Sequence, residues 1–349
     1  MFSLDKILRE NVKNLKPYSS ARNEYTGKEA VFLDANENPY DSSYNRYPDP
    51  LQVEVKKRIS EIKKIEPDKI FLGNGSDETI DLLIRAFCEP RIDNIVSVEP
   101  SYGMYKVLAD INNVKFNTVL LAGDFQLNAD DILKATDNNT KLIFLCSPNN
   151  PTAVCFRTQD IVTILNNFDG IVAVDEAYID FSSKGSLLSI LDNYRNLVIL
   201  QTFSKAWGLA GIRLGMGYAD SEIINVLNSI KYPYNISSLT LETAVKQLSD
   251  SKSKKIWINR ILKSRDKLAR KLNDLPFVIK VYPSDANFLL VKVDSAKKIY
   301  DYLVDKKIIV RDRSNIILCE GCLRITVGTE DENTILLDAL KEYEKILLK

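Results

Sequence analysis

The sequence predicts an α/β fold: a large domain with a mostly parallel, mixed sheet flanked by helices, and a smaller α+β domain. Three observations support this expectation. Short apolar runs alternate with segments of helical period between residues 69 and 218. After residue 239 the pattern changes to charged helical segments and a few short strands. A chain of 349 residues also suits about two domains.

The apolar runs of the first region are the expected strands, because each one ends at polar, Gly or Pro residues. Their continuous apolar character is typical of strands that are buried on both faces. Two intervening segments begin with a capping residue and space their apolar residues as a helix does. The strands are expected at 69–73, 94–98, 141–147, 170–176 and 197–204, and the two helices at 76–87 and 158–168.

The last third of the chain is expected to build the smaller domain. Its helical, charged part is followed by strand-like runs and a closing helix. The first forty residues lack a sheet pattern, so we expect them to pack on this second domain. The large domain is therefore expected at 41–238 and the small domain at 1–40 and 239–349. Within the small domain the helical part is 239–275, the strands are at 277–293, 308–313 and 322–328, and the closing helix is 334–348.

The composition excludes several classes of partner. Lys plus Arg and Asp plus Glu both number 47, which leaves no electrostatic case for nucleic acid or an anionic membrane. No run is long enough to span a bilayer, and the N-terminus lacks the apolar core of a secretory signal. The five cysteines are an odd, scattered set, which suits reduced thiols in the cytoplasm. The pair Cys319 and Cys322 is interpreted as packed thiols, so no metal is expected.

The chain contains no histidine. This absence removes Ser-His-Asp and Cys-His nucleophile systems as well as His-ligated metals. Catalysis near neutral pH must then come from lysine, tyrosine, cysteine, carboxylates or a cofactor.

Lys205 is the strongest candidate for such chemistry. It follows a buried strand, has Thr202 and Ser204 beside it, and precedes Arg213 across a glycine-containing turn. A lysine amine can form a Schiff base with an aldehyde cofactor, and the hydroxyls and guanidinium can hold that cofactor's phosphate. The alternative is an ordinary solvated lysine, which these neighbours disfavour.

Two further groups have a functional and a simpler interpretation. The stretch GNGSDETI at 73–80 follows a strand and opens a helix, where backbone amides and a hydroxyl could hold a phosphate. Taken alone, Ser76 or Asp77 is more simply a helix N-cap.

Asp175 ends an apolar run, with Tyr178 three residues later. This pair could hold a pyridine ring by its nitrogen and phenolic oxygen, or the carboxylate could be only a cap or salt-bridge partner.

Six motifs occur in the order and spacing of fold-type I pyridoxal-phosphate-dependent aminotransferases of the class II subgroup. The set most resembles the histidinol-phosphate aminotransferase family, and matches run from Pro17–Tyr18 to Gly328. An ordered set is far more specific than any one motif. The motifs are GNGSDE, PSYGMY, SPNNPT, VDEAYIDF, TFSKAWGLAGIRLG and CLRITVG.

The resemblance implies roles for residues around pyridoxal 5′-phosphate. Lys205 would form the internal aldimine and, once displaced, move the proton between Cα and C4′. Asp175 would pair with the pyridine nitrogen, while Tyr178 and Asn150 would bond the ring oxygen. Tyr102 would stack on the ring face, although a core aromatic is the commoner fate. The phosphate region would be surrounded by Gly75, Ser76, Asp77, Thr202, Ser204 and Arg213.

The resemblance also implies a homodimer and a substrate. Tyr47 would reach the phosphate from the neighbouring subunit, so the active sites would be shared. Arg324 would bind the amino-donor carboxylate, for which a planar guanidinium is suited. Arg311 and Tyr18 would contact the substrate phosphate, with Arg313 as a nearby substitute for Arg311.

One position departs from the family pattern. Ala153 stands after NPT, where the family usually has glycine. If this position needs a positive φ, alanine costs about 1 kcal/mol. We expect the loop that carries Asn150 to tolerate it.

The implied activity is ping-pong transamination between L-histidinol phosphate and 2-oxoglutarate, giving imidazole acetol phosphate and L-glutamate, in histidine biosynthesis. The alternatives within the fold are an aromatic or broad-specificity aminotransferase and a threonine-phosphate decarboxylase. A non-enzymatic, PLP-binding regulator would need a DNA-binding domain, for which there is no room ahead of Tyr18. A dinucleotide-binding enzyme is disfavoured because no G-x-G-x-x-G turn follows a strand.

Overall fold

The computed structural model describes residues 2–16 and 31–347. Its larger unit is built on a seven-stranded sheet with the order β1-β7-β6-β5-β4-β2-β3. All neighbouring strands are parallel except β7, which runs antiparallel to both β1 and β6. The strands are β1 (Ile70–Asn74), β2 (Asn94–Glu99), β3 (Lys115–Leu120), β4 (Thr140–Cys146), β5 (Ile171–Asp175), β6 (Leu197–Thr202) and β7 (Leu214–Tyr218).

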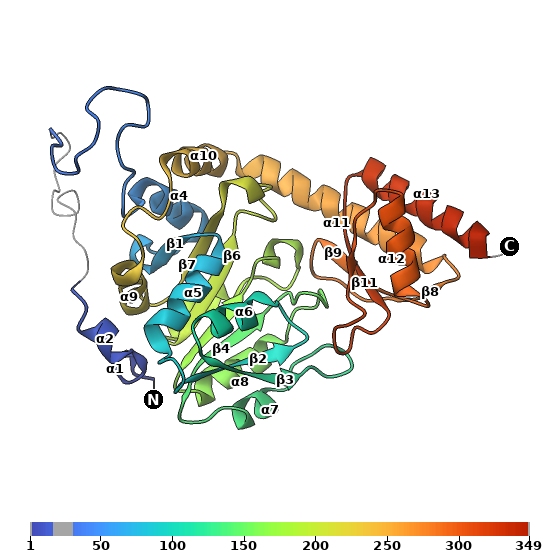
Figure 1. Cartoon of the computed structure of the whole chain (residues 1–349), viewed down its shortest axis with the longest axis horizontal. Coiled ribbons are helices and arrows are strands. Elements are labelled where there is room, and N and C mark those ends of the chain that lie inside the picture. The colour runs from blue at the N-terminus through green and yellow to red at the C-terminus, as the bar shows by residue number, and fades with distance from the viewer. Residues whose placement is uncertain (1, 17–30, 348–349) are drawn as a thin grey trace.

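Helices cover both faces of this sheet, which explains why its central strands are buried and mostly apolar (Figure 1). In β4, Leu142 and Phe144 pack into one core while Ile143 and Leu145 pack into the core on the opposite face. The first core is covered by α5 (Ser76–Phe87), α6 (Met104–Ile111) and α9 (Ser221–Ile230); the second by α4 (Val53–Lys63), α7 (Ala129–Lys134), α8 (Thr158–Asn167) and α10 (Ser238–Leu248).

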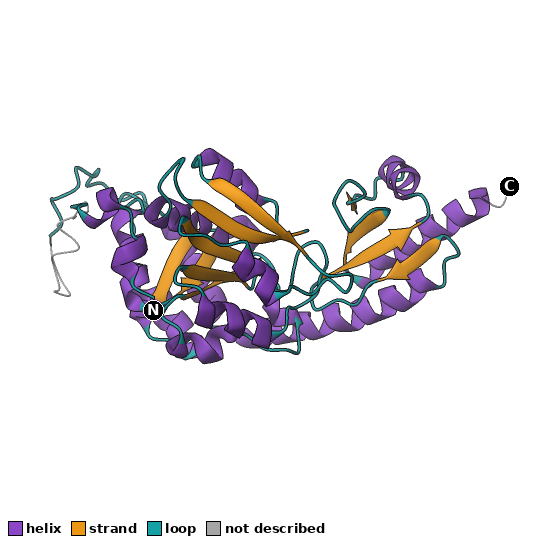
Figure 2. Ribbon diagram, turned by 90° about the horizontal axis from the view of Figure 1, so that it is seen from below, coloured by secondary structure: helices purple, strands orange, loops and turns teal. Residues whose placement is uncertain are grey.

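The smaller unit contains a four-stranded antiparallel sheet with the order β10-β11-β9-β8. The long helix α11 (Ser251–Asn273) runs from the larger unit to this sheet, and the two sheets lie apart along the molecule (Figure 2). A separate apolar core joins the sheet to the helices around it. The elements are β8 (Val278–Val281), β9 (Phe288–Val293), α12 (Ala296–Asp305), β10 (Arg311–Asp312), β11 (Cys322–Thr326) and α13 (Glu330–Leu347).

The expected fold class is confirmed, but two strands of the large sheet were not expected. The edge strand β3 is only partly buried, so it lacks the continuous apolar run used as the signal. The strand β7 reads LGMGY, and its two glycines weaken a strand pattern. Short 3₁₀ turns complete the chain: Pro67–Lys69, Ile179–Phe181, Leu187–Asn193 and Ala210–Ile212.

Some residues outside 41–238 contact the cores of the large unit. Helices α1 (Leu4–Ile7) and α2 (Glu10–Lys13) lie near the large sheet, and Ile7 is buried in one of its cores. The Arg9 N–H donates to the Ala86 carbonyl oxygen at the end of α5, 3.0 Å away. In α10, Ala244 also packs in the large unit. These segments therefore make contacts with the large unit. The division of the chain into 41–238 and its flanking parts stays a prediction.

In the part of the chain that the structure describes, no helix combines the length and apolar character needed to cross a membrane.

Candidate active site

A cavity of about 160 Å³ opens where β4, β5 and β6 end beside the start of α5. This position follows the rule that parallel sheets bind ligands at the carboxyl ends of their strands. The cavity brings together every cofactor-binding candidate except Tyr47, and adds Cys146, Ala177 and Ala210. The candidates in its lining are Gly75, Ser76, Asp77, Tyr102, Asn150, Asp175, Tyr178, Thr202, Ser204, Lys205 and Arg213.

The start of α5 is shaped to receive an anion. Gly75 is its N-cap with a φ of 75°, and no side chain caps the helix. The simpler interpretation of Ser76 or Asp77 as an N-cap is therefore wrong. A Cβ at Gly75 would lie 2.7 Å from Nη2 of Arg213, so glycine leaves the room that this guanidinium occupies. Helix N–H groups and a guanidinium thus meet at one point.

Backbone hydrogen bonds fix Arg213 beside this helix. The residue adopts a φ of 52°, and its carbonyl oxygen accepts from the Gly75 N–H at 2.8 Å. A guanidinium nitrogen of Arg213 lies 3.5 Å from Oγ of Ser204, which accepts from it. Ser204 Oγ also accepts from the Thr202 hydroxyl at 3.0 Å. Hydroxyls, amide N–H groups and one guanidinium are the donors that a phosphate requires.

Asp175 lies at the end of β5 and is 3% exposed. Its Oδ1 accepts from the Ala177 N–H at 3.0 Å, and its Oδ2 accepts from the Tyr105 hydroxyl at 3.1 Å. Burial raises the pKa of Asp175 to about 6. Such a carboxylate is suited to pair with a cationic N–H group inside the cavity.

Lys205 follows β6, and its ammonium nitrogen lies 5.6 Å from the centre of the Tyr178 ring. The lysine is exposed through the mouth of the cavity, but the surrounding walls still remove part of its hydration. This desolvation lowers the pKa of Lys205, and the positive charge of Arg324 lowers it further. A lower pKa increases the share of neutral amine, which is the nucleophilic form.

Two tyrosines border the space between Lys205 and Asp175. The Tyr102 hydroxyl donates to Oδ1 of Asp77 at 3.2 Å. Tyr178 packs edge-on against Phe288, with ring centres 5.1 Å apart. Burial raises the pKa of Tyr102 and of Tyr178, so both phenols stay protonated near neutral pH.

One arginine of the small sheet reaches a residue of this cavity. Nη1 of Arg324 donates to Oδ1 of Asn150, which lines the cavity. Arg311 stands directly opposite Arg324 in the β10–β11 pair, so both side chains leave the same face of the sheet. Arg313 has a buried Nε without a hydrogen-bond partner in the described residues. Tyr18, the fourth candidate for substrate binding, lies outside the described residues.

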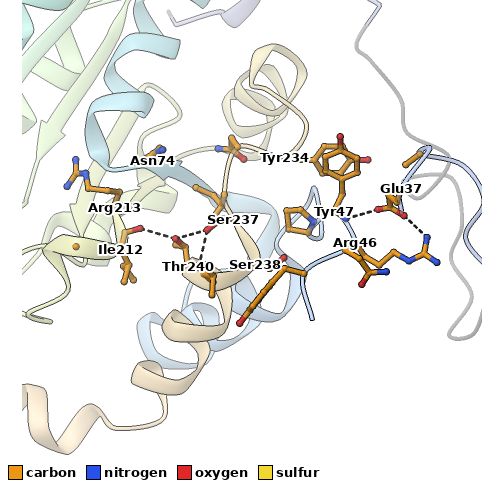
Figure 3. Close-up of a pocket in the computed structure, with 18 of the residues that line it drawn as sticks. Glu37, Arg46, Tyr47, Asn74, Ile212, Arg213, Tyr234, Ser237, Ser238 and Thr240 are labelled. Atoms are coloured by element: carbon orange, nitrogen blue, oxygen red, sulfur yellow. Dashed lines mark hydrogen bonds and ion pairs between the residues drawn. The ribbon is translucent and has the colours of Figure 1, made fainter. Parts of the chain in front are cut away.

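Tyr47 does not line the Lys205 cavity; it lies in an adjoining cavity of about 750 Å³. Its ring stacks on Tyr234 with centres 4.5 Å apart, and its N–H donates to Glu37 at 2.6 Å (Figure 3). Arg213 lines both cavities, and Figure 3 shows it at the side opposite to Tyr47.

Sequence reasoning missed two polar groups of the site. Cys146 ends β4, as Asp175 ends β5, so the strand-end rule applied to this neighbouring strand could have found it. Tyr105 belongs to α6 and bonds to Asp175 from beneath the cavity. Nothing in the local sequence distinguishes Tyr105 from an ordinary core aromatic.

Comparison with known proteins places this geometry among enzymes. A sequence model of the family "Aminotransferase class I and II" matches residues 21–340. The histidinol-phosphate aminotransferase of Cytophaga hutchinsonii is 56% identical over 346 residues, covering 98% of this chain and 99% of that protein. The crystal structure of the histidinol-phosphate aminotransferase from Clostridium acetobutylicum has a TM-score of 0.80 at 27% identity, covering 87% of this chain and 92% of that one.

A second similar structure contains a cofactor. The histidinol-phosphate aminotransferase of Sinorhizobium meliloti, solved in complex with pyridoxal-5′-phosphate, has a TM-score of 0.79 at 24% identity. The match covers 86% of this chain and 84% of that one. At this identity the comparison establishes the shared fold.

Proposed function

The chain belongs to the class I and II aminotransferases, and on this premise we propose that it is a PLP-dependent histidinol-phosphate transaminase. It transfers an amino group between L-histidinol phosphate and 2-oxoglutarate, forming imidazole acetol phosphate and L-glutamate in histidine biosynthesis. The observation that carries the proposal is that Lys205, the buried Asp175 carboxylate and the first residues of α5 line one cavity.

The residues of the cavity fit pyridoxal 5′-phosphate. The absence of a Cβ at Gly75 leaves room beside the Arg213 guanidinium, which supports a phosphate position at the start of α5. Asp175 is the buried acceptor that a protonated pyridine nitrogen requires, and Lys205 is the amine that an aldehyde requires. When bound, the cofactor supplies an aldehyde that condenses with amines and an electron-withdrawing ring that acidifies the substrate's Cα–H bond.

Each side chain then has a defined task. The neutral Lys205 amine would accept the proton from the substrate's Cα. It would then return this proton to the C4′ position. The Asp175 carboxylate accepts a hydrogen bond from the ring nitrogen, and Tyr178 and Asn150 donate to the ring oxygen. Tyr102 covers one ring face. The phosphate would be surrounded by Gly75, Ser76, Asp77, Thr202, Ser204 and Arg213, whose backbone N–H groups, hydroxyls and guanidinium would donate to it.

The small sheet supplies the substrate contacts. Arg324 binds the carboxylate of glutamate, since its guanidinium offers a planar pair of donors. Arg311, with Tyr18, binds the phosphate of the second substrate, and Arg313 stands close enough in sequence to share this task. The two half-reactions use one site in turn, so the kinetics are ping-pong.

Turnover measured side by side tests the substrate. We expect L-histidinol phosphate to exceed L-histidinol, L-phenylalanine and L-threonine phosphate in kcat/KM with 2-oxoglutarate. Preference for phenylalanine would favour an aromatic or broad-specificity enzyme, and release of CO₂ from threonine phosphate would favour a decarboxylase. Equal rates with histidinol and its phosphate would contradict the roles given to Arg311 and Tyr18.

Borohydride reduction tests the lysine. Reduction of the loaded enzyme followed by peptide mass spectrometry is expected to place the cofactor on the peptide containing Lys205. The Lys205→Ala enzyme is expected to lose this adduct and about 10²- to 10⁴-fold in kcat. A covalent adduct that persists in Lys205→Ala would refute the mechanism.

We propose further that the enzyme is a homodimer in which Tyr47 serves the neighbouring subunit's phosphate site. This is supported by the position of Tyr47 outside the cavity of its own chain. Mixing Lys205→Ala with Tyr47→Ala chains tests it, because each mixed dimer would then contain one intact site. Activity should return to about a quarter of the wild-type value after random exchange of subunits. No recovery would mean that Tyr47 acts within its own chain or that subunits do not exchange, and tagged subunits distinguish these two cases.

The proposed compartment is the cytoplasm. All five cysteines are buried and unpaired, which suits a reducing environment. The partners are small amino acids and keto acids, and neither nucleic acid nor a membrane is proposed as a partner.

A further inference from the structure

The buried Asp175 carboxylate raises a physical problem, because a buried charge needs compensation. Its two oxygens accept only two hydrogen bonds in the described part of the chain, one from the Ala177 N–H and one from the Tyr105 hydroxyl. No arginine or lysine forms an ion pair with it there. The chain also has no histidine that could supply a cationic donor. Tyr105 is therefore the single side-chain donor to this carboxylate among the described residues.

We propose that Tyr105 is a positioning residue for the proposed transamination: its hydroxyl aims the Asp175 carboxylate into the cavity and keeps it ionised. Tyr105 belongs to α6 and does not line the cavity, so it acts through Asp175 rather than on the substrate. The inference rests on the proposed function for its consequence in catalysis, but the hydrogen bond itself can be tested without any substrate.

Packing holds the Tyr105 hydroxyl in one place. The residue is completely buried, and its ring stacks on Phe144 with centres 5.1 Å apart at an angle of 14°. On another side it meets Tyr102 edge-on, with ring centres 5.5 Å apart. A ring fixed in this way cannot turn its hydroxyl elsewhere without opening the core. The donor is thus preorganised, and the carboxylate takes the position that the donor dictates.

The other groups that face Asp175 do not replace this donor. Lys205, the one cation among them in the described residues, is exposed at the cavity mouth and acts on the carboxylate only through space. Asp77, across the cavity, opposes ionisation because its charge has the same sign. The Cys146 thiol donates to the Pro148 carbonyl oxygen at 3.3 Å and also lies within hydrogen-bond reach of the Tyr105 hydroxyl, but it does not bond to Asp175. The Tyr102 hydroxyl donates to Asp77. Tyr102 and Tyr178 carry no charge near neutral pH, because burial raises the pKa of both phenols.

The hydrogen bond from Tyr105 also affects whether a proton shared by Asp175 and the cofactor's ring nitrogen stays on the ring. Donation from Tyr105 stabilises the charged form of Asp175 and so lowers its affinity for a proton. A protonated ring nitrogen bound against Asp175 then keeps its proton, which is the state that withdraws electrons. Without the hydroxyl, the more basic carboxylate draws the proton away from the ring.

Tyr105→Phe removes the hydroxyl and keeps the ring, so it is the variant of choice. In holoenzyme reconstituted with ¹⁵N-labelled pyridoxal 5′-phosphate, we expect the pyridine ¹⁵N resonance to move toward the neutral-ring position. In the full-length chain without cofactor, urea unfolding from pH 4.5 to 8.5 gives a second readout. The stability lost by Tyr105→Phe should increase as pH rises through about 6, by about tenfold in the unfolding constant, because a bond to a charged acceptor is stronger than one to a neutral acceptor.

Two controls separate this role from a merely structural one. In an Asp175→Asn background, the cost of Tyr105→Phe should no longer depend on pH, since the amide introduced there does not titrate. Tyr218→Phe removes another fully buried hydroxyl, whose oxygen lies 3.1 Å from the Met216 sulfur, and should show no such pH dependence.

An unchanged ¹⁵N resonance, or an equal loss of stability at every pH, would overturn the proposal. If the coupling to Asp175 is present but histidinol phosphate is not a substrate, the proposed function fails while the role of Tyr105 stands.

Discussion

Nη1 of Arg324 lies 2.6 Å from Oδ1 of Asn150 and joins a strand of the small sheet to the loop that follows β4 of the large sheet. The same guanidinium lies over the Phe288 ring, 5.4 Å from its centre. Asn150 is thereby oriented by a side chain 174 residues away in sequence. The proposed carboxylate-binding arginine and a proposed ring contact are therefore one connected unit.

Arg324→Lys is expected to raise KM for glutamate by about 10- to 100-fold, because an ammonium cannot offer the paired donors of a guanidinium. The bond to Asn150 is lost as well, so cofactor affinity should fall together with substrate affinity. Steady-state kinetics with glutamate and a cofactor titration measure the two effects.

Arg195→Lys is the matched control for that change. Arg195 forms an exposed ion pair with Glu222 at 2.8 Å, remote from the cavity, and such pairs contribute little. Its kinetics should equal those of the wild type. If KM for glutamate is unchanged in Arg324→Lys, then Arg324 does not bind the substrate carboxylate.

Gly75→Ala is expected to weaken cofactor binding by about tenfold or more, since its methyl group would lie 2.7 Å from the Arg213 guanidinium. The variant should also lose about 1 kcal/mol of stability through its left-handed backbone. Gly185→Ala separates these effects, because Gly185 has a φ of 77° but no atom within 4 Å of an added Cβ. Calorimetric titration with pyridoxal 5′-phosphate should show normal affinity in Gly185→Ala, and equal affinities in both variants would refute the steric argument.

Ala153→Gly is expected to change the free energy of unfolding by less than about 1 kcal/mol. Ala153 adopts a φ of 65°, as the family's usual glycine suggested, so glycine relieves strain. The alanine methyl is fully buried beside Tyr178 and Phe288, and removing it costs about 0.8 kcal/mol. Denaturant unfolding of both proteins measures the difference in free energy of unfolding, which is the sum of the relieved backbone strain and the lost packing. A gain well above about 1 kcal/mol would mean that the methyl contributes no packing.

Lys205→Met is expected to stabilise the cofactor-free chain near neutral pH. Desolvation lowers the pKa of Lys205 in the folded state, so the unfolded state binds the proton more tightly. The gain should be fully present below the folded pKa and should fade as pH rises toward the ordinary lysine value of 10.5. Unfolding measured between neutral pH and this value tests the sign. A gain that does not change over this range would show that hydrophobic packing by methionine, rather than lost charge, is its cause.

Much of the large sheet could be predicted because each central strand contains a continuous apolar run. Helix α5 begins and ends where its period indicates, at residues 76 and 87. The strands β3 and β7 could not be found in this way, since one is half-exposed and the other contains two glycines. Their pairing depends on neighbours distant in sequence, and β7 lies between β1 and β6.

The sequence by itself determined the fold class, the family and the residue types that meet at the ends of the strands, because these follow from periodicity and from ordered motifs. Only the tertiary structure decided which side chains touch. It showed that Gly75 rather than Ser76 caps α5, and that Tyr105 reaches Asp175 from the core. The physical reason is that a hydrogen bond or a cap depends on distances of a few tenths of an ångström between elements far apart in the chain, which no local pattern encodes.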